Sequence, residues 1–412
     1  MNKTTTNLFI AIDRSDQKLS IAESDAESAP KLSEIPSAPE EIHAWALTKL
    51  QQTEGQIFIA FENPAPNLIC AFSQYNRIVQ YPLNPAATDN FRKAFSPSMA
   101  KDDGTDALSM LEMLIKHQDS LTPLKPETPE IRLLQSLVND RRQAVDLGCA
   151  LNNILTDQMK RHFPQALKIF DDLSSAMACA FLKKWPTLQQ VQKAKPETLR
   201  KFFYLNHSRS EKLVEKRIEI IRHSLPLTND AAVLEAAKIH TLTLINQINA
   251  NRNSVQAYDK KIKTLYDSLE DSAIYNSLPG AGDIIAPRLL AAFGSIRENY
   301  ATAEDMQKFS GIAPVVKRSG KKELICRRWR CPTFIHQTFI EFAKWSAVYS
   351  KWGKAYARQK KDEGMAYWSV IRSLAYKWIR ILHTLWSKGE LYDEDLHIKN
   401  LIKQGVPYAA KL

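Results

Sequence analysis

The sequence predicts an α/β domain at the N-terminus followed by a mostly helical remainder. Strand and helix signals alternate over the first 120 residues, and the strand signals fade after about residue 130. The 412 residues contain 44% hydrophobic residues and only 12 glycines, which is typical of a folded, helix-rich chain. This length is enough for two or three domains that each bury a core.

Apolar runs and helical periodicity define the elements of the first domain in order. The predicted strands span residues 8–13, 18–23 and 56–62, with another near 77–81. The predicted helices span residues 39–51 and 104–117, with another near 67–74. An opening hairpin followed by strand, helix and strand is consistent with a ribonuclease-H-like α/β domain.

Four carboxylates interrupt this pattern at the ends of elements. Asp13 and Glu62 each end an apolar strand, where an acid is unexpected. Asp103 and Asp106 lie at the start of the third predicted helix, and their spacing of three residues places them on one helix face. If the four side chains meet, their mutual repulsion favours a bound cation. We therefore expect a divalent metal site.

Charge is distributed unevenly along the chain. The net charge is +11, yet residues 1–120 hold 10 Lys/Arg and 16 Asp/Glu, which leaves 46 and 29 for the rest. An acidic first part suits a metal site, and a basic remainder suits a polyanion.

The cysteines and the N-terminus favour a reducing cytoplasm. The five cysteines are scattered, and the first residues are polar without an apolar signal-peptide core. Cys326, Cys331 and His336 suggest a zinc site only weakly, because no second ligand pair at a familiar spacing accompanies them. No apolar stretch approaches the roughly 20 residues of a membrane span. We expect a soluble protein without a membrane partner.

A heptad register runs through a stretch without Pro or Gly, from about residue 230 to 270. Six seam positions recur every seven residues from Leu234 to Leu269, and a second set falls three residues after each of the first five. This pattern predicts a coiled coil that pairs chains, and one long helix packed on its own domain is the alternative. Asn251 at a seam position would fix the register.

A Pro-Gly-x-Gly turn, Pro279 to Gly282, precedes a helical run that ends at Phe293. The backbone N–H groups of Gly280 and Gly282 at a helix N-terminus suit a phosphate oxygen, in the style of a helix-hairpin-helix contact. Glycines also cap helices for purely structural reasons.

A basic segment follows, with seven cations in the fourteen residues from Lys317 to Arg330. They are Lys317, Arg318, Lys321, Lys322, Arg327, Arg328 and Arg330. Such a cluster neutralises phosphates, and Trp329 is placed to stack on a base or to pack behind the arginines. Local sequence favours Ser319 as a turn residue, since no His-Asp pair that would activate its hydroxyl is nearby. Aromatic residues from Phe334 to Trp386 recur at helical intervals, which predicts core packing.

Together these motifs resemble the DEDD transposases of bacterial insertion sequences, often called the IS-one-ten family. The family's Asp, Glu, Asp, Asp set falls on the four carboxylates, and the segment Lys101 to Ala107 is similar to the family's Lys-x-Asp-x-x-Asp-Ala. The family's C-terminal domain opens with Leu-Pro-Gly-x-Gly, here beginning at Leu278, and reaches a Ser-Gly pair, here Ser319-Gly320. The resemblance spans nearly the whole chain in the right order.

The resemblance implies a RuvC-like catalytic domain over residues 1–165, a helical linker and coiled coil over 166–271, and a transposase domain over 272–412. It implies Mg²⁺ (or Mn²⁺) held by Asp13, Glu62, Asp103 and Asp106, and Ser319 as the nucleophile that forms a phosphoserine link to DNA. The carboxylates and the serine would have to meet in space, which contact between subunits would allow. Lys101 joins the expected nucleic-acid contacts.

The implied partners are donor and target double-stranded DNA and a structured bridge RNA that guides strand exchange. The implied assembly is a homo-oligomer, a dimer that forms a tetramer, in the bacterial cytoplasm at the nucleoid.

Two positions depart from the family pattern, and two other functions stay open. The family often has Gln where this chain has Arg318, and Asp102, four residues before Asp106, is an alternative to Asp103. A RuvC-like structure-specific DNA endonuclease would hydrolyse phosphodiesters with metal-activated water and leave Ser319 as a turn residue. A nucleic-acid-binding protein with an inactive site is the non-enzymatic alternative.

Overall fold

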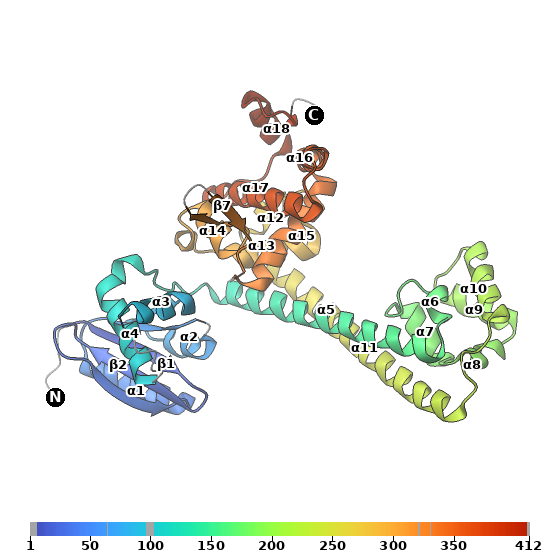
Figure 1. The fold of residues 1–412 in the computed structure, drawn as a ribbon, viewed down its shortest axis with the longest axis horizontal. Helices are drawn as coiled ribbons and strands as arrows, with labels where there is room; N and C mark the ends of the chain where they lie inside the picture. The colour runs from blue at the N-terminus through green and yellow to red at the C-terminus, as the bar shows by residue number, and fades with distance from the viewer. Residues whose placement is uncertain (1–5, 64, 96–102, 320–321, 330, 410–412) are drawn as a thin grey trace. The chain divides into compact units, whose positions relative to one another are not determined.

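The computed structural model describes residues 6–63, 65–95, 103–319, 322–329 and 331–409. At Ala86, Phe95, Asp103, Lys317, Ser319 and Lys322 it describes the backbone only. The chain forms two compact units, Met1–Pro126 and Glu127–Leu412, and each is considered by itself (Figure 1). The division into three domains stays a prediction.

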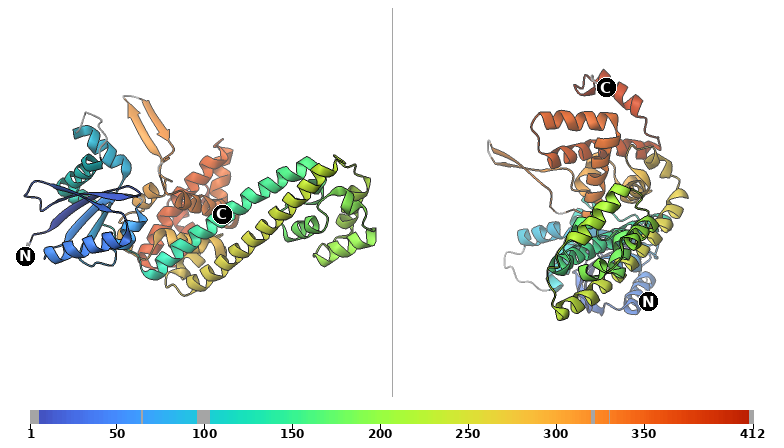
Figure 2. Two further views of the ribbon diagram at one scale, coloured as in Figure 1. Left: turned by 90° about the horizontal axis from the view of Figure 1, so that it is seen from below. Right: turned by 90° about the vertical axis from the view of Figure 1, so that its right-hand side faces the viewer.

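The first unit is a mixed five-stranded sheet with helices on both faces (Figures 1 and 2). Its elements are β1 (Leu8–Arg14), β2 (Lys18–Ser24), β3 (Lys31–Pro36), α1 (Pro39–Gln52), β4 (Ile57–Glu62), α2 (Pro66–Phe72), β5 (Ile78–Leu83), α3 (Pro85–Phe95), α4 (Asp103–His117) and the 3₁₀ turn η1 (Gln118–Ser120). The strand order is β3-β2-β1-β4-β5, antiparallel among the first three strands and parallel from β1 to β5. This mixed α/β unit confirms the predicted fold class for the N-terminus.

Alternation along the strands sends successive side chains to opposite faces of the sheet. Ile10 and Ile12 pack with α1 and α2 on the first face. Ala11, Ala22 and Ala60 lie side by side in register on the second face, where α4 packs on them. The absence of bulk on these three alanines lets α4 approach the sheet closely.

The second unit is built on two long helices, α5 (Pro129–His162) and α11 (Ala231–Asp267), which run side by side (Figure 2). Ile262 packs near Val138 at one end, and Leu244 packs near Leu155 at the other, so the two helices are antiparallel. Asn251 donates its Nδ2 hydrogen bond to the carbonyl oxygen of Ala144, 3.0 Å away. The heptad face of α11 therefore packs on α5 of its own chain. This is the alternative of one long helix packed on its own domain, and α5 covers the face through which two chains were expected to pair.

Further helices and one two-stranded hairpin pack at the two ends of the pair formed by α5 and α11. One end carries α6 (Ala166–Ile169), α7 (Ala176–Lys184), α8 (Leu188–Gln192), α9 (Pro196–Leu205) and α10 (Glu211–His223). The other carries α12 (Ser272–Asn276), α13 (Gly282–Phe293), η2 (Arg297–Asn299), α14 (Ala303–Phe309), β6 (Val315–Ser319), β7 (Lys322–Cys326), α15 (Thr333–Tyr349), α16 (Lys351–Asp362), α17 (Tyr367–Lys388) and α18 (Glu394–Lys403). No described helix is long and apolar enough to cross a membrane.

The aromatic residues of the C-terminal helices divide between core and surface. Trp352, Trp378 and Trp386 are buried, as the helical spacing predicts. Trp345, Tyr349 and Trp368 are exposed, so core packing is the wrong explanation for those three. Helical spacing specifies a face of each helix, and which face the rest of the fold covers depends on the neighbouring helices.

Candidate active site

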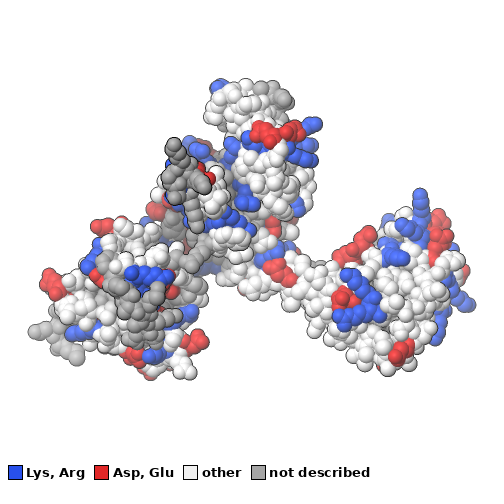
Figure 3. Space-filling model, viewed as in Figure 1, with Lys and Arg blue, Asp and Glu red and all other residues white. Residues whose placement is uncertain are grey.

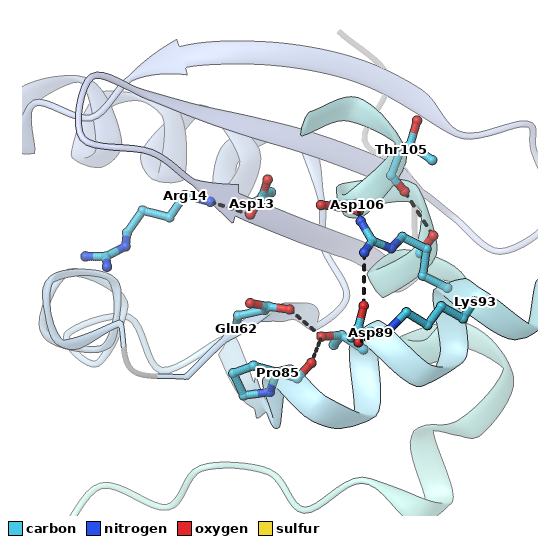
Figure 4. A network of polar contacts seen from close by, with 11 residues as sticks. Asp13, Arg14, Glu62, Pro85, Asp89, Lys93, Thr105 and Asp106 are labelled. Carbon is cyan, nitrogen blue, oxygen red and sulfur yellow. Dashed lines mark hydrogen bonds and ion pairs between the residues drawn. The ribbon is translucent and has the colours of Figure 1, made fainter. Parts of the chain in front are cut away.

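Asp13 and Glu62 lie next to each other at the ends of two parallel strands (Figure 4). Ile12 pairs with Phe61 in the parallel register of β1 and β4, so Asp13 and Glu62 are the next residues along each strand. Since side chains alternate between faces, both point to the face that Ala11 and Ala60 share, where α4 lies. Strand parity alone brings the two acids together.

The first turn of α4 supplies the third carboxylate. Ala107 is completely buried in the contact between α4 and the sheet, and this anchors the preceding residue, Asp106, at the rim. Asp13, Glu62 and Asp106 line one cavity of about 380 Å³. Asp103 is the first residue of α4, and its side chain lies outside the described atoms. Asp102 and Lys101 also lie outside the described residues.

Helix α3 forms another wall of this cavity and contacts two of the acids (Figure 4). The Thr88 hydroxyl donates a hydrogen bond to Glu62 Oε1. Arg92 donates from Nη1 to Asp106 Oδ1 at 2.8 Å and from Nη2 to Asp89 Oδ1 at 3.0 Å. The hydrogen bond and charge of Asp106 raise the pKa of Arg92, so its guanidinium stays protonated.

Asp89 is a further carboxylate of the cavity that the sequence did not indicate. Lys93 donates a hydrogen bond to its Oδ2 at 2.7 Å, and this bond is the main reason that the pKa of Asp89 is lowered. Arg92 lies four residues after Thr88 and three after Asp89, so it shares a side of α3 with each of them. The sequence did not indicate these three residues, because they interrupt no apolar run. Polar residues at their positions are also typical of the exposed surface of any helix.

The chemistry of the cavity fits a hard divalent cation. Carboxylate oxygens are the ligands that Mg²⁺ prefers, and three of them come here from separate elements. Among the described side chains, no three acidic, histidine or cysteine groups converge closely enough to hold one ion as they stand. One oxygen of each of two acids instead accepts a hydrogen bond, Glu62 Oε1 from Thr88 and Asp106 Oδ1 from Arg92.

Ser319 lies in the second unit, at the end of strand β6 of a two-stranded hairpin. It pairs with Lys322 across the turn, and the preceding pair, Arg318 and Glu323, forms an ion pair at 3.1 Å. The sequence predicts the turn but not the strands, because the flanking apolar residues Val316 and Ile325 are exposed rather than packed in a core. The serine therefore stands at the tip of a basic hairpin.

The remaining basic residues extend from this hairpin. Arg327 and Arg328 follow β7, and the Arg327 guanidinium lies 4.8 Å from the centre of the Trp329 ring, which is 79% exposed. Lys317 and Lys322 belong to the strands, while Lys321 and Arg330 lie outside the described residues.

No zinc site forms near the hairpin among the described residues. His336 Nδ1 is 3.1 Å from the carbonyl oxygen of Ser310. Burial raises the pKa of the Cys331 thiol, which opposes the thiolate that zinc binding needs.

The predicted glycine turn precedes α13. Gly280 has φ +84° and Gly282 has φ +52°, both in the left-handed region that favours glycine. No side chain caps the N-terminus of α13 at Ala281. Asp283 lies in the first turn of α13, and its Oδ2 is 3.9 Å from Lys263 Nζ. A glycine turn is therefore present at the start of α13, and a helix-hairpin-helix contact with phosphate stays a prediction.

A mixed sheet of this order, with carboxylates at the ends of β1 and β4, is consistent with the ribonuclease-H-like class of folds. Residues 10–164 match the model of an IS110-type transposase DEDD domain, and residues 272–358 match the transposase IS116/IS110/IS902 family. The chain belongs to this family of insertion-sequence transposases.

Two Streptomyces proteins are similar over most of the chain. A Streptomyces coelicolor protein named as the candidate mini-circle transposase for IS117 is 23% identical over 343 residues, covering 82% of each chain. An uncharacterised protein of insertion element IS116 from Streptomyces clavuligerus is 21% identical over 313 residues, covering 75% of this chain and 76% of its own.

Proposed function

We propose that this chain is a Mg²⁺- or Mn²⁺-dependent DNA recombinase of an insertion sequence, which cuts and rejoins donor and target DNA under the direction of a guide RNA. The observation that supports it most strongly is the single cavity lined by Asp13, Glu62 and Asp106 in a chain of a transposase family. Asp103 completes the proposed set of ligands. A divalent cation held by these groups would polarise the scissile phosphate.

Ser319 is the proposed nucleophile. Its Oγ–P bond forms as the P–O bond to the leaving strand breaks, and the serine proton passes to the leaving oxygen. The phosphoserine ester preserves the energy of the phosphodiester, so a second strand can be joined without an external energy source. The carboxylates and the serine belong to different compact units, so the reaction requires that they meet in the active assembly.

Sequence recognition is assigned to base pairing by the RNA, and the protein holds the nucleic-acid backbone. Figure 3 shows Lys and Arg side chains in several separate groups on the visible face of the second unit. Dispersed cations suit contact with phosphates along extended strands better than the reading of a short base sequence. The proposed place of action is the cytoplasm, at the bacterial nucleoid.

Trapping of a covalent complex tests the nucleophile. Wild-type protein is incubated with Mg²⁺, guide RNA and labelled donor and target DNA, then denatured. A protein–DNA adduct is expected for the wild type and for Ser369→Ala, which changes an exposed serine of α17, and is expected to be absent for Ser319→Ala and Asp106→Asn.

Two outcomes contradict this proposal. An adduct that persists in Ser319→Ala overturns the serine assignment. Metal-dependent cleavage without any adduct or rejoining in the wild type favours the endonuclease that uses activated water.

Mixing variants tests how the two units meet in the proposed oligomer. If one subunit's serine serves another subunit's carboxylates, a mixture of Asp106→Asn and Ser319→Ala regains part of the strand exchange. If each chain is self-sufficient, the mixture stays inactive while either variant mixed with wild type is active in proportion to the wild type present.

A further inference from the structure

Arg92 places a permanent cation on one of the acids that the proposed metal needs. Its guanidinium binds Asp106 at 2.8 Å and Asp89 at 3.0 Å, and it lines the same cavity as Asp13 and Glu62. The side chains of Arg92 and Asp106 are only 24% and 25% exposed, so the pair is partly shielded from water. An oxygen engaged by a guanidinium is a poorer ligand for a metal, because the two cations compete for it.

The two carboxylates that hold Arg92 have different surroundings. Asp89 also accepts from Lys93 on its other oxygen, and both residues belong to the same helix as Arg92. Asp106 belongs to α4 and lies beside the strand-end acids. If the contact with Asp106 breaks, Asp89 still retains the guanidinium at the wall of the cavity.

We propose that Arg92 neutralises Asp106 before metal binds and is transferred to a nucleic-acid phosphate when metal binds. The proposal rests on the proposed metal-dependent function. Asp89 keeps the guanidinium inside the cavity during the exchange, so its planar N–H groups meet the phosphate that the metal polarises. Metal binding would therefore free the Arg92 guanidinium to bind the substrate phosphate.

The competition predicts that removing Arg92 tightens metal binding while weakening catalysis. Breaking a partly exposed ion pair of this kind changes affinity by about twofold to fivefold. Arg92→Gln is therefore expected to bind Mn²⁺ about twofold to fivefold more tightly than the wild type, in the absence of DNA and RNA. Its strand cleavage at saturating metal is expected to fall, because the phosphate loses a cation.

Lys93→Gln is the matched control. It removes the same charge from the adjacent residue and breaks a contact with Asp89, but the Lys93 side chain makes no hydrogen bond with Asp106. Any effect of net charge alone appears equally in both variants. Arg92→Lys keeps the charge and is expected to lie between the wild type and Arg92→Gln.

Direct titration with Mn²⁺, followed by electron paramagnetic resonance of the free ion, separates the possible failures. If the wild type and Arg92→Gln both bind Mn²⁺ but with the same affinity, or if Lys93→Gln matches Arg92→Gln, the role of Arg92 is refuted and the metal site stands. If no full-length variant binds Mn²⁺ in a manner that depends on Asp106, the proposed metal-dependent function fails first. Circular dichroism of each variant confirms that the fold is retained.

Discussion

Replacing Gly280 by alanine should destabilise the second unit more than replacing Gly282, although both have left-handed backbone angles. A Cβ at position 280 would lie 3.0 Å from the carbonyl carbon of Trp345, 3.1 Å from its oxygen and 3.2 Å from its Cβ. A Cβ at position 282 would meet nothing within 4 Å. The pair of variants therefore separates the backbone conformation from the close approach of α15.

The expected magnitudes follow from these two contributions. The left-handed conformation costs an L-residue about 1–2 kcal/mol, and both variants incur this cost. The atoms of Trp345 that the new Cβ meets are mainly backbone atoms, which cannot rotate away, so overpacking adds about 1–3 kcal/mol at position 280. We expect about 1–2 kcal/mol for Gly282→Ala and about 2–5 kcal/mol for Gly280→Ala.

Thermal unfolding followed by tryptophan fluorescence measures the difference. Of the eight tryptophans all but Trp45 lie in the second unit, so the signal reports mainly on that unit. A shift of about 2–4 °C per kcal/mol is typical of large domains, so the two melting temperatures should differ by several degrees. Equal melting temperatures would refute the idea that contact with Trp345 adds to the cost at position 280. A lower melting temperature for Gly282→Ala than for Gly280→Ala would also refute it.

Three further changes test the packing and the electrostatics. Ala60→Leu places a large side chain under α4 and should cost about 1–3 kcal/mol, seen as faster hydrogen exchange along α4. Glu341→Ala leaves the guanidinium of Arg288, which is 4% exposed, without its charged partner and should cost about 3–5 kcal/mol in denaturant unfolding, part of which Arg288→Met in the same chain restores. Burial lowers the pKa of His336 below its ordinary 6.5, so the unfolded chain binds more protons between the two pKa values. Stability should therefore fall as the pH drops below about 6.5, and His336→Gln should lose less over the same range. An unchanged pH dependence in that variant would refute this last prediction.

The pattern of the sequence was sufficient for the strands that face a core. β1, β2, β4 and β5 agree with the predicted runs to within two residues at either end. β3 was missed because Lys31–Pro36 is largely exposed and carries no apolar alternation, so only its backbone pairing with β2 defines it. The hairpin β6–β7 was missed for the same reason, since Leu324 and Ile325 are exposed.

The candidate site divides in a similar way. Asp13 and Glu62 were identifiable because each breaks an apolar run, and the parallel register then brings them together. Their partners Thr88 and Arg92 were not identifiable, because polar residues on a helix surface look alike until the helix is placed. Only the packing of α3 beside the strand ends shows that these side chains contact the acids.

By itself the sequence determined the α/β class of the first unit, the helical character of the second, the acids at the strand ends and the family. These properties are local, since they depend on side-chain period and on short motifs. The tertiary structure decided which surfaces those residues meet: α5 rather than a second chain on the heptad face of α11, and Arg92 on Asp106. The spacing of apolar residues specifies which face of a helix or strand is buried. Which element covers that face depends on the packing of the whole chain.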